Sequence, residues 1–157
     1  MRVAFGADDE NGTTAAVLAR LTEAGHEVVR PTPSRDWPEV GAEVGRAVAG
    51  GAADLGVVMC WTGTGVSIAA NKVPGVRAAL AWEPWVARGA RRWNDANVLA
   101  LSLTRLAPDV AVDVLDAFLA VDGPDPDEKA AVEQVALLDA ERVSAPGPAP
   151  AGPRSTR

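Results

Sequence analysis

The sequence predicts an α/β protein with a parallel sheet that is covered by helices on both faces. Two observations carry this prediction. Short apolar runs of strand length alternate with segments whose apolar residues recur at helical spacing, and the connections between them are short. Open sheets of this kind bind ligands at the carboxyl ends of their strands. Functional residues are therefore expected where each apolar run ends.

Five runs are predicted to be strands. The first ends at a glycine, and the third is almost continuously apolar, as expected for a strand buried on both faces. The predicted strands are 2–6, 27–30, 55–59, 76–81 and 98–101.

Helices are predicted between and after these strands. In the first of them, Val17, Leu18 and Leu21 lie at helical spacing, and Gly25 is a suitable stop. The last begins at an Asp-Pro-Asp-Glu sequence, which suits a helix N-terminus. The predicted helices are 13–24, 40–48, 66–72, 84–93, 108–119 and 124–142, with a loop at 31–38. Residues 144–157 are rich in Pro, Ala and Gly and are expected to be disordered, which makes 1–143 a single domain.

Composition narrows the class of partner. The chain has 157 residues, is 48% hydrophobic and carries a net charge of −6, so nucleic acid and anionic membranes are poor partners. One cysteine allows no internal disulfide and fits a reducing cytoplasm. The sequence shows neither a signal-peptide pattern nor an apolar run of transmembrane length. A cytoplasmic protein that acts on a small molecule is the expectation.

The segment 55–72 carries the strongest functional signal. An apolar run ends in Cys60, and a Thr-Gly-Thr-Gly loop then leads into a predicted helix. Unpaired backbone N–H groups at such a turn favour negative charge. A thiol beside them could remove a proton next to a carbonyl, while the N–H groups stabilise the resulting enediolate. The alternative is that Cys60 is a small buried apolar residue and that the loop is an ordinary turn.

Four stretches give the chain a resemblance to a known family. They read RVAFGAD, CWTGTGVSIAANK, GVRAALAWEPWVAR, and NDANVLAL with the following PDVAVDVLDAFL. In order and spacing they resemble the type B ribose-5-phosphate isomerases, a family that includes galactose-6-phosphate isomerase. The resemblance implies a Rossmann-like three-layer sandwich with a five-stranded parallel sheet and a C-terminal helix used in dimerisation. It also implies homodimers, sometimes tetramers, whose active sites are shared between subunits and need no metal or cofactor.

The resemblance also implies roles for individual residues. Asp8 would hold sugar hydroxyls, Cys60 would move the proton between C1 and C2, and Asn94 would come from the partner subunit. Around the thiol, the matching loop and helix residues are Thr62, Gly63, Thr64, Gly65 and Ser67.

Several positions depart from the family pattern. Asp9 and Trp93 stand where the family has histidines, and Thr104 takes the place of an arginine, with Arg105 one residue later. A phosphate dianion is normally held by arginine or lysine side chains or by helix N-termini, so these changes predict a less anionic substrate. Asp9 is the substitute expected near the site for acid–base work, because the single histidine, His26, precedes the second strand.

The chain has five tryptophans and no tyrosine. Four of them are predicted to line a flat aromatic pocket, namely Trp37, Trp61, Trp85 and Trp93. Trp82, and in the alternative all five, would pack in the core or a dimer interface.

Three functions remain open from the sequence. The first is an isomerase that uses Cys60 for a 1,2-proton transfer on a larger or less anionic hydroxy-carbonyl substrate, such as a natural-product intermediate. The second is a true ribose-5-phosphate isomerase of the pentose phosphate pathway. The third is a non-catalytic binding or regulatory paralogue.

Overall fold

The structure, a computed structural model, describes residues 1–144 and contains a five-stranded sheet in which every neighbouring pair is parallel. The order across the sheet is β2-β1-β3-β5-β4. The strands are β1 (Arg2–Ala7), β2 (Glu27–Val29), β3 (Leu55–Cys60), β4 (Ala78–Leu80) and β5 (Val98–Ser102). The direction in which successive strands are added reverses between β1 and β3, because β2 lies on one side of β1 and the later strands lie on the other. Open sheets of this type bind ligands at the carboxyl ends of the strands at such a reversal.

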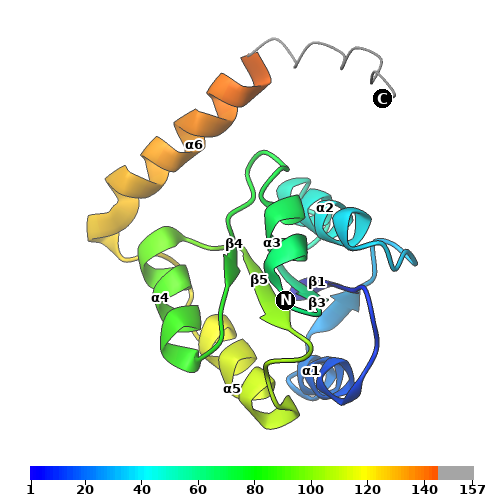
Figure 1. Cartoon of the computed structure of the whole chain (residues 1–157). Helices are drawn as coiled ribbons and strands as arrows, with labels where there is room; N and C mark the ends of the chain where they lie inside the picture. Colours follow the sequence, from blue (N-terminus) through cyan, green and yellow to red (C-terminus); the bar gives the residue numbers. More distant parts are fainter. Residues whose placement is uncertain (145–157) are drawn as a thin grey trace, which may run out of the picture.

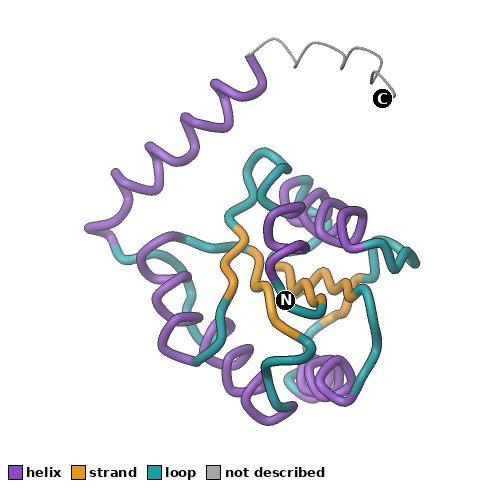
Figure 2. Tube along the Cα trace, in the orientation of Figure 1, coloured by secondary structure: helices purple, strands orange, loops and turns teal. Residues whose placement is uncertain are grey.

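Helices cover both faces of the sheet, as Figures 1 and 2 show. One face carries α2 (Trp37–Ala49) and α3 (Thr64–Ala70), which pack against each other. The other carries α1 (Gly12–Glu23), α4 (Pro84–Asn94) and α5 (Pro108–Leu119). This is the predicted Rossmann-like three-layer sandwich.

Two apolar cores fill the spaces between these layers. Strand residues alternate between the faces, so Phe5, Met59 and Leu101 join the core under α1, α4 and α5. Val58, Cys60 and Ala100 join the core under α2 and α3. The face toward which the side chain at the end of a strand points therefore follows from the number of residues that separate it from these core residues.

Gly41 lets α2 and α3 approach closely. A Cβ at this position would lie 2.6 Å from the carbonyl oxygen of Val66 and 2.8 Å from the Cβ of Ala69. Any side chain there would push the two helices apart, and with them the start of α3 that faces the glycine loop.

A short 3₁₀ turn, η1 (Pro126–Glu128), leads into α6 (Lys129–Ser144), which stands apart from the rest of the domain in Figure 1. Asp139 accepts a 2.7 Å hydrogen bond from the backbone N–H of Gly75. Val135, Leu137 and Leu138 nevertheless remain largely exposed, Leu137 to 64%. Exposed apolar side chains grouped in this way are typical of surfaces that bind another molecule.

The predicted strands and helices are all present, with shifts at their ends. Helix α2 begins at Trp37, inside the predicted loop, because Pro38 is well suited to a first helical turn. Helix α3 begins at Thr64, directly after Gly63 in a left-handed conformation. The predicted final helix is divided into η1 and α6, and α6 extends through Ser144. The rest of the predicted disordered tail, 145–157, lies outside the described residues.

Candidate active site at the carboxyl edge of the sheet

Three polar residues form a row across the sheet where β1, β3 and β5 end. Ala7 pairs with Met59 in register, so Asp8, the next residue, lies opposite Cys60. Cys60 in turn pairs with Ser102. Alternation along the strands directs all three side chains toward α2 and α3. Neighbouring strands lie about 4.8 Å apart, so the thiol stands between a carboxylate and a hydroxyl.

Hydrogen bonds fix the loop that follows Cys60. The backbone N–H of Leu103 donates to the Cys60 carbonyl at 2.9 Å. The Trp61 carbonyl accepts from the Ser102 hydroxyl at 2.6 Å, from the Thr104 hydroxyl at 2.8 Å and from the Thr104 N–H at 3.3 Å. The indole of Trp61 meanwhile stays 63% exposed. Its backbone is fixed while its side chain is free to meet a ligand.

Gly63 is required at the turn into α3. Its φ is 76°, and a Cβ there would lie 2.5 Å from Cδ1 of Leu80. Its N–H donates to the Cys60 carbonyl at 3.2 Å, so this N–H is already engaged. At the first turn of α3, the Thr64 N–H donates to the Thr62 hydroxyl in a long 3.4 Å hydrogen bond, so the Gly65 N–H is the group left to receive an anionic oxygen.

Three hydroxyls on this segment have different surroundings. The Thr62 and Thr64 hydroxyls are exposed and lie 2.6 Å apart beside the loop. The Ser67 hydroxyl lies within 3.5 Å of the Ala78 carbonyl and ties α3 to β4. Within the described chain, Ser67 therefore serves the scaffold.

Cys60 is buried, as is Gly63 among the predicted site residues. Cys60 is 5% exposed and belongs to the apolar core with Val40, Val66 and Ala100. The thiol side chain therefore offers little surface to a ligand in this conformation.

Asp8 and Asp9 differ in their surroundings. The Oδ1 atom of Asp8 is buried and has no hydrogen-bond partner. Burial, and secondarily the charge of Asp9, raise the pKa of the Asp8 carboxyl. Asp9 is exposed, and its Oδ1 accepts a 2.8 Å hydrogen bond from the N–H of Glu10.

Cationic side chains are sparse around these carboxylates. Arg35 and Arg30 face Glu10 at 3.0 and 3.8 Å. Arg105 is exposed at the end of β5, and its N–H donates to the Ser102 hydroxyl at 3.1 Å. The edge therefore offers one exposed arginine close to the row and two that already face a carboxylate.

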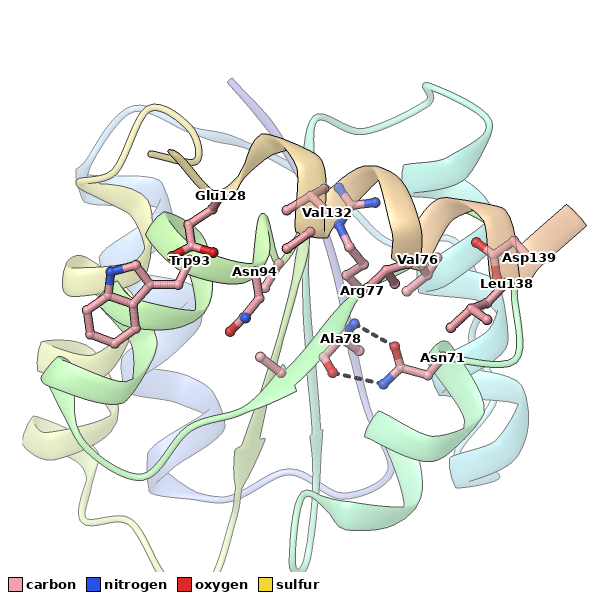
Figure 3. Close-up of a pocket in the computed structure, with 14 residues that line it drawn as sticks. Asn71, Val76, Arg77, Ala78, Trp93, Asn94, Glu128, Val132, Leu138 and Asp139 are labelled. Carbon is pink, nitrogen blue, oxygen red and sulfur yellow. Dashed lines mark hydrogen bonds between the residues drawn. The ribbon is translucent and has the colours of Figure 1, made fainter. Parts of the chain in front are cut away.

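Asn94 and Trp93 lie at the opposite edge of the sheet. They end α4, just before β5 begins, whereas Cys60 pairs with the last residue of β5. Both line a cavity of about 520 Å³ between α6 and β4, together with Arg77 and Glu128 (Figure 3). Within one chain, the structure does not bring Asn94 to the thiol.

The turn after Asn94 is tightly held. Asp95 has a φ of 47°, the one positive φ of a non-glycine residue among those described. Its carboxylate accepts from Arg77 at 2.6 Å and from the buried Arg91 at 3.3 Å, and its carbonyl accepts from Nε of Arg77 at 2.7 Å. The Asn97 side chain links Arg77 and Gly75 through two further 2.8 Å hydrogen bonds. The NDAN sequence thus builds the turn that presents Asn94.

The tryptophans divide between the two edges. The indole of Trp37 packs on Gly65, where an added Cβ would lie 3.0 Å from it. Trp85 and Trp93 contact each other edge to face along α4, with ring centroids 5.4 Å apart. Trp61 and Trp82 are exposed after β3 and β4. Trp37 and Trp61 accordingly flank the glycine loop, and Trp93 lies with Asn94.

Sequence reasoning gave no role to Ser102 or Thr104, although both lie in a predicted strand-end segment. Both hydroxyls bond the Trp61 carbonyl, which lies 41 and 43 residues earlier in the sequence, and no local motif predicts such a contact. In residues 1–144, no group of three or more His, Cys, Asp or Glu side chains could hold a metal ion. Nor does any helix in this part of the chain have the length and apolarity to cross a membrane.

The fold and this edge define an α/β protein with a buried thiol and a glycine turn beside the point where the strand order of a parallel sheet reverses. The sequence matches the family described as Ribose/Galactose Isomerase over residues 3–135. The chain belongs to this family.

Individual relatives agree with that assignment. Ribose-5-phosphate isomerase B of Escherichia coli is 34% identical over 90% of this chain and 98% of its own length. D-erythrulose-4-phosphate isomerase of Pectobacterium atrosepticum is 36% identical over 53% of this chain and 55% of its own. The solved structure of Clostridium thermocellum ribose-5-phosphate isomerase B superposes with a TM-score of 0.84 at 33% identity, covering 90% of this chain and 99% of that one. The chain is accordingly an isomerase of the aldose–ketose type, with its substrate open.

Proposed function

We propose that this protein catalyses a cofactor-independent 1,2-proton transfer through an enediolate, with Cys60 as the base. The observation that carries the proposal is the row of Asp8, Cys60 and Ser102 beside the glycine loop. In this mechanism the thiolate removes the proton from the carbon next to the carbonyl. The Gly65 N–H, joined by the Thr64 N–H when the Thr62 hydroxyl turns to the substrate, stabilises the developing oxyanion, and the proton returns to the adjacent carbon.

The other predicted residues fit around this step. Thr62 lies beside the reacting oxygen, Asp8 contacts hydroxyls, and Trp37 and Trp61 flank the loop as apolar walls. Ser67, in contrast, has its hydroxyl directed to the Ala78 carbonyl, which argues for a structural role.

We further propose a larger or less anionic substrate than a pentose phosphate, such as a hydroxy-carbonyl intermediate of natural-product biosynthesis. Asp9 adds an exposed negative charge at the edge, and Arg105 is the one nearby exposed arginine without an acidic partner among the described ion pairs. Phosphate recognition normally uses several such donors. The runner-up is ribose 5-phosphate, which is favoured by the match to the E. coli enzyme over almost its full length.

The proposed site is shared between two copies of the chain. Asn94 and Trp93 lie far from Cys60 within one chain, and α6 leaves apolar side chains uncovered. A homodimer in which α6 packs on the partner would cover that surface and could bring Asn94 to the partner's thiol. We expect this dimer to act in the cytoplasm, where the single cysteine remains reduced.

The test is turnover and solvent-deuterium incorporation with a panel of aldoses, with and without a terminal phosphate. Unmodified protein should incorporate deuterium at the carbon next to the carbonyl. Cys60→Ala should lower that rate by about 10³-fold, because the base is gone, while its circular dichroism and melting curve stay unchanged. Undiminished exchange in Cys60→Ala would place the base elsewhere. No exchange by the unmodified protein with any aldose would favour a non-catalytic paralogue, and faster turnover of the phosphorylated sugars would favour the pentose phosphate.

A further inference from the structure

The carboxyl edge lacks an imidazole that could open a sugar ring. The sequence contains one histidine, His26, and it precedes β2, at the opposite edge of the sheet from Cys60. Most aldoses are cyclic hemiacetals in water, and the proton next to the carbonyl becomes acidic only in the open form. An isomerase acting on such a sugar gains from a group that moves protons between its oxygen atoms.

We propose that Asp8 is the acid–base group that opens the ring of a cyclic aldose at this site. The proposal rests on the isomerase function proposed above and gives Asp8 a task beyond contacting hydroxyls. Its substrate class is any aldose that closes into a hemiacetal ring.

Position favours Asp8 for this task. It lies beside Cys60 on the adjacent strand, and both side chains face α2 and α3. The proposal places C2 of the sugar at the thiol and C1 on the side of Asp8, a placement that one C1–C2 bond and the spacing of about 4.8 Å between neighbouring strands allow.

The state of the carboxylate also favours it. Oδ1 of Asp8 is buried and has no hydrogen-bond partner, so this oxygen is an acceptor that lacks a donor. A hydroxyl of the ligand would satisfy it. The raised pKa makes this carboxylate a stronger base than an exposed one. Asp9 is less suited, because it is exposed and its Oδ1 already accepts from the Glu10 N–H.

The step balances without another reactant. The Asp8 carboxylate takes the proton of the anomeric hydroxyl, and the electrons of that O–H bond form the C1 carbonyl. The bond between C1 and the ring oxygen breaks, and the ring oxygen receives the proton back from the Asp8 carboxyl. Asp8 ends as it began, and the open aldehyde is ready for Cys60.

The experiment compares two probes that both carry a terminal phosphate, so that weak phosphate binding affects them alike. Ribose 5-phosphate closes into a ring, whereas erythrose 4-phosphate cannot form a five-membered ring because its terminal oxygen is esterified. Deuterium exchange at C2 is followed by mass spectrometry. For Asp8→Asn we expect the ribose 5-phosphate rate to fall by about 10²-fold and the erythrose 4-phosphate rate to stay within about threefold.

Two further variants act as matched controls. Glu10→Gln removes a carboxylate from the same loop and should leave both rates unchanged, whereas Cys60→Ala should abolish both. Asp8→Ala leaves space for a small carboxylate, so added formate should restore exchange with ribose 5-phosphate at least tenfold. This rescue tests the same role of the carboxylate in a second, independent variant.

Each other outcome is decisive. Asp8→Asn with an unchanged ribose 5-phosphate rate, or with both rates lowered equally, would overturn the ring-opening role, and the second result would leave Asp8 as a binding residue. Absence of formate rescue would also contradict it. If unmodified protein exchanges neither probe while exchanging another aldose, the same comparison is made with that aldose and its ring-blocked methyl ether. If it exchanges no aldose at all, the isomerase function itself fails, which is a separate result.

Discussion

The two edges of the sheet carry different parts of the proposed site. The carboxyl edge holds the groups that can move protons, Asp8 and Cys60, with a glycine turn beside them. The amino edge holds Asn94, Trp93 and the larger cavity, built on a network of ion pairs. In the proposed function, one edge supplies the reactive groups and the other supplies binding groups. The distance between the two edges implies that, if Asn94 acts at the thiol, it comes from a second copy of the chain.

Complementation between two inactive variants tests this separation most sharply. Cys60→Ala and Asn94→Ala should each be nearly inactive as homodimers. Mixing equal amounts under conditions that exchange subunits should restore about a quarter of the unmodified activity, because half the dimers are mixed and each has one intact site. The measurement is initial turnover against mixing time.

A matched control uses Cys60→Ala mixed with Cys60→Ser, which cannot complement in any arrangement. Failure of the first mixture to recover activity, despite subunit exchange shown by native mass spectrometry, would mean that both residues act in one chain. Full activity of Asn94→Ala on its own would mean that Asn94 has no role.

Asp95 tests how the amino edge is built. Asp95→Ala should lower the free energy of unfolding by about 3 kcal/mol, because it leaves the buried Arg91 without its charged partner and places alanine in a left-handed conformation. Urea denaturation measures the change. Asp95→Asn should lose less, since asparagine tolerates that conformation. Equal losses in the two variants would show that backbone conformation contributes little.

The smallest expected effect is a change in thermal stability caused by the Asp8 carboxyl. Its folded-state pKa is raised by burial and by Asp9, so the stability that Asp8 contributes is present at low pH and is lost as pH rises through that raised pKa. Asp8→Asn should therefore melt about 2 °C above the unmodified protein at pH 7. The difference should shrink as the pH falls through the raised folded-state pKa and vanish only well below the unfolded-state pKa of 3.8. The neighbouring carboxylates are Asp9 and Glu10, and Glu10 faces two arginines, so the same scan on Glu10→Gln is the control.

The sequence was sufficient for the fold because periodicity and strand-end glycines are local signals. The five strands and their parallel arrangement follow from them, with differences of one to three residues at the ends of elements, as at Trp37. The motif around Cys60 also placed its own loop correctly after β3. Local signals do not give the register between neighbouring strands, and this register places Asp8 and Ser102 beside Cys60.

Burial was the harder property to predict. The 5% exposure of Cys60 results from α2 and α3 meeting above it, which depends on Gly41 far away in sequence. The sequence likewise did not show that residues 94–97 form a turn held by arginines, because Arg77 lies just before β4, 18 residues before Asp95. Asn94 could be matched to a family position, but its distance from the thiol within one chain emerges only from the topology.

The three donors that converge on the Trp61 carbonyl have a consequence for how this protein can change. The main chain there is held by Ser102 and Thr104, so almost any side chain could replace the indole without disturbing the turn. Position 61 is thus a place where selection, or a laboratory library, can alter ligand preference with little risk to foldability.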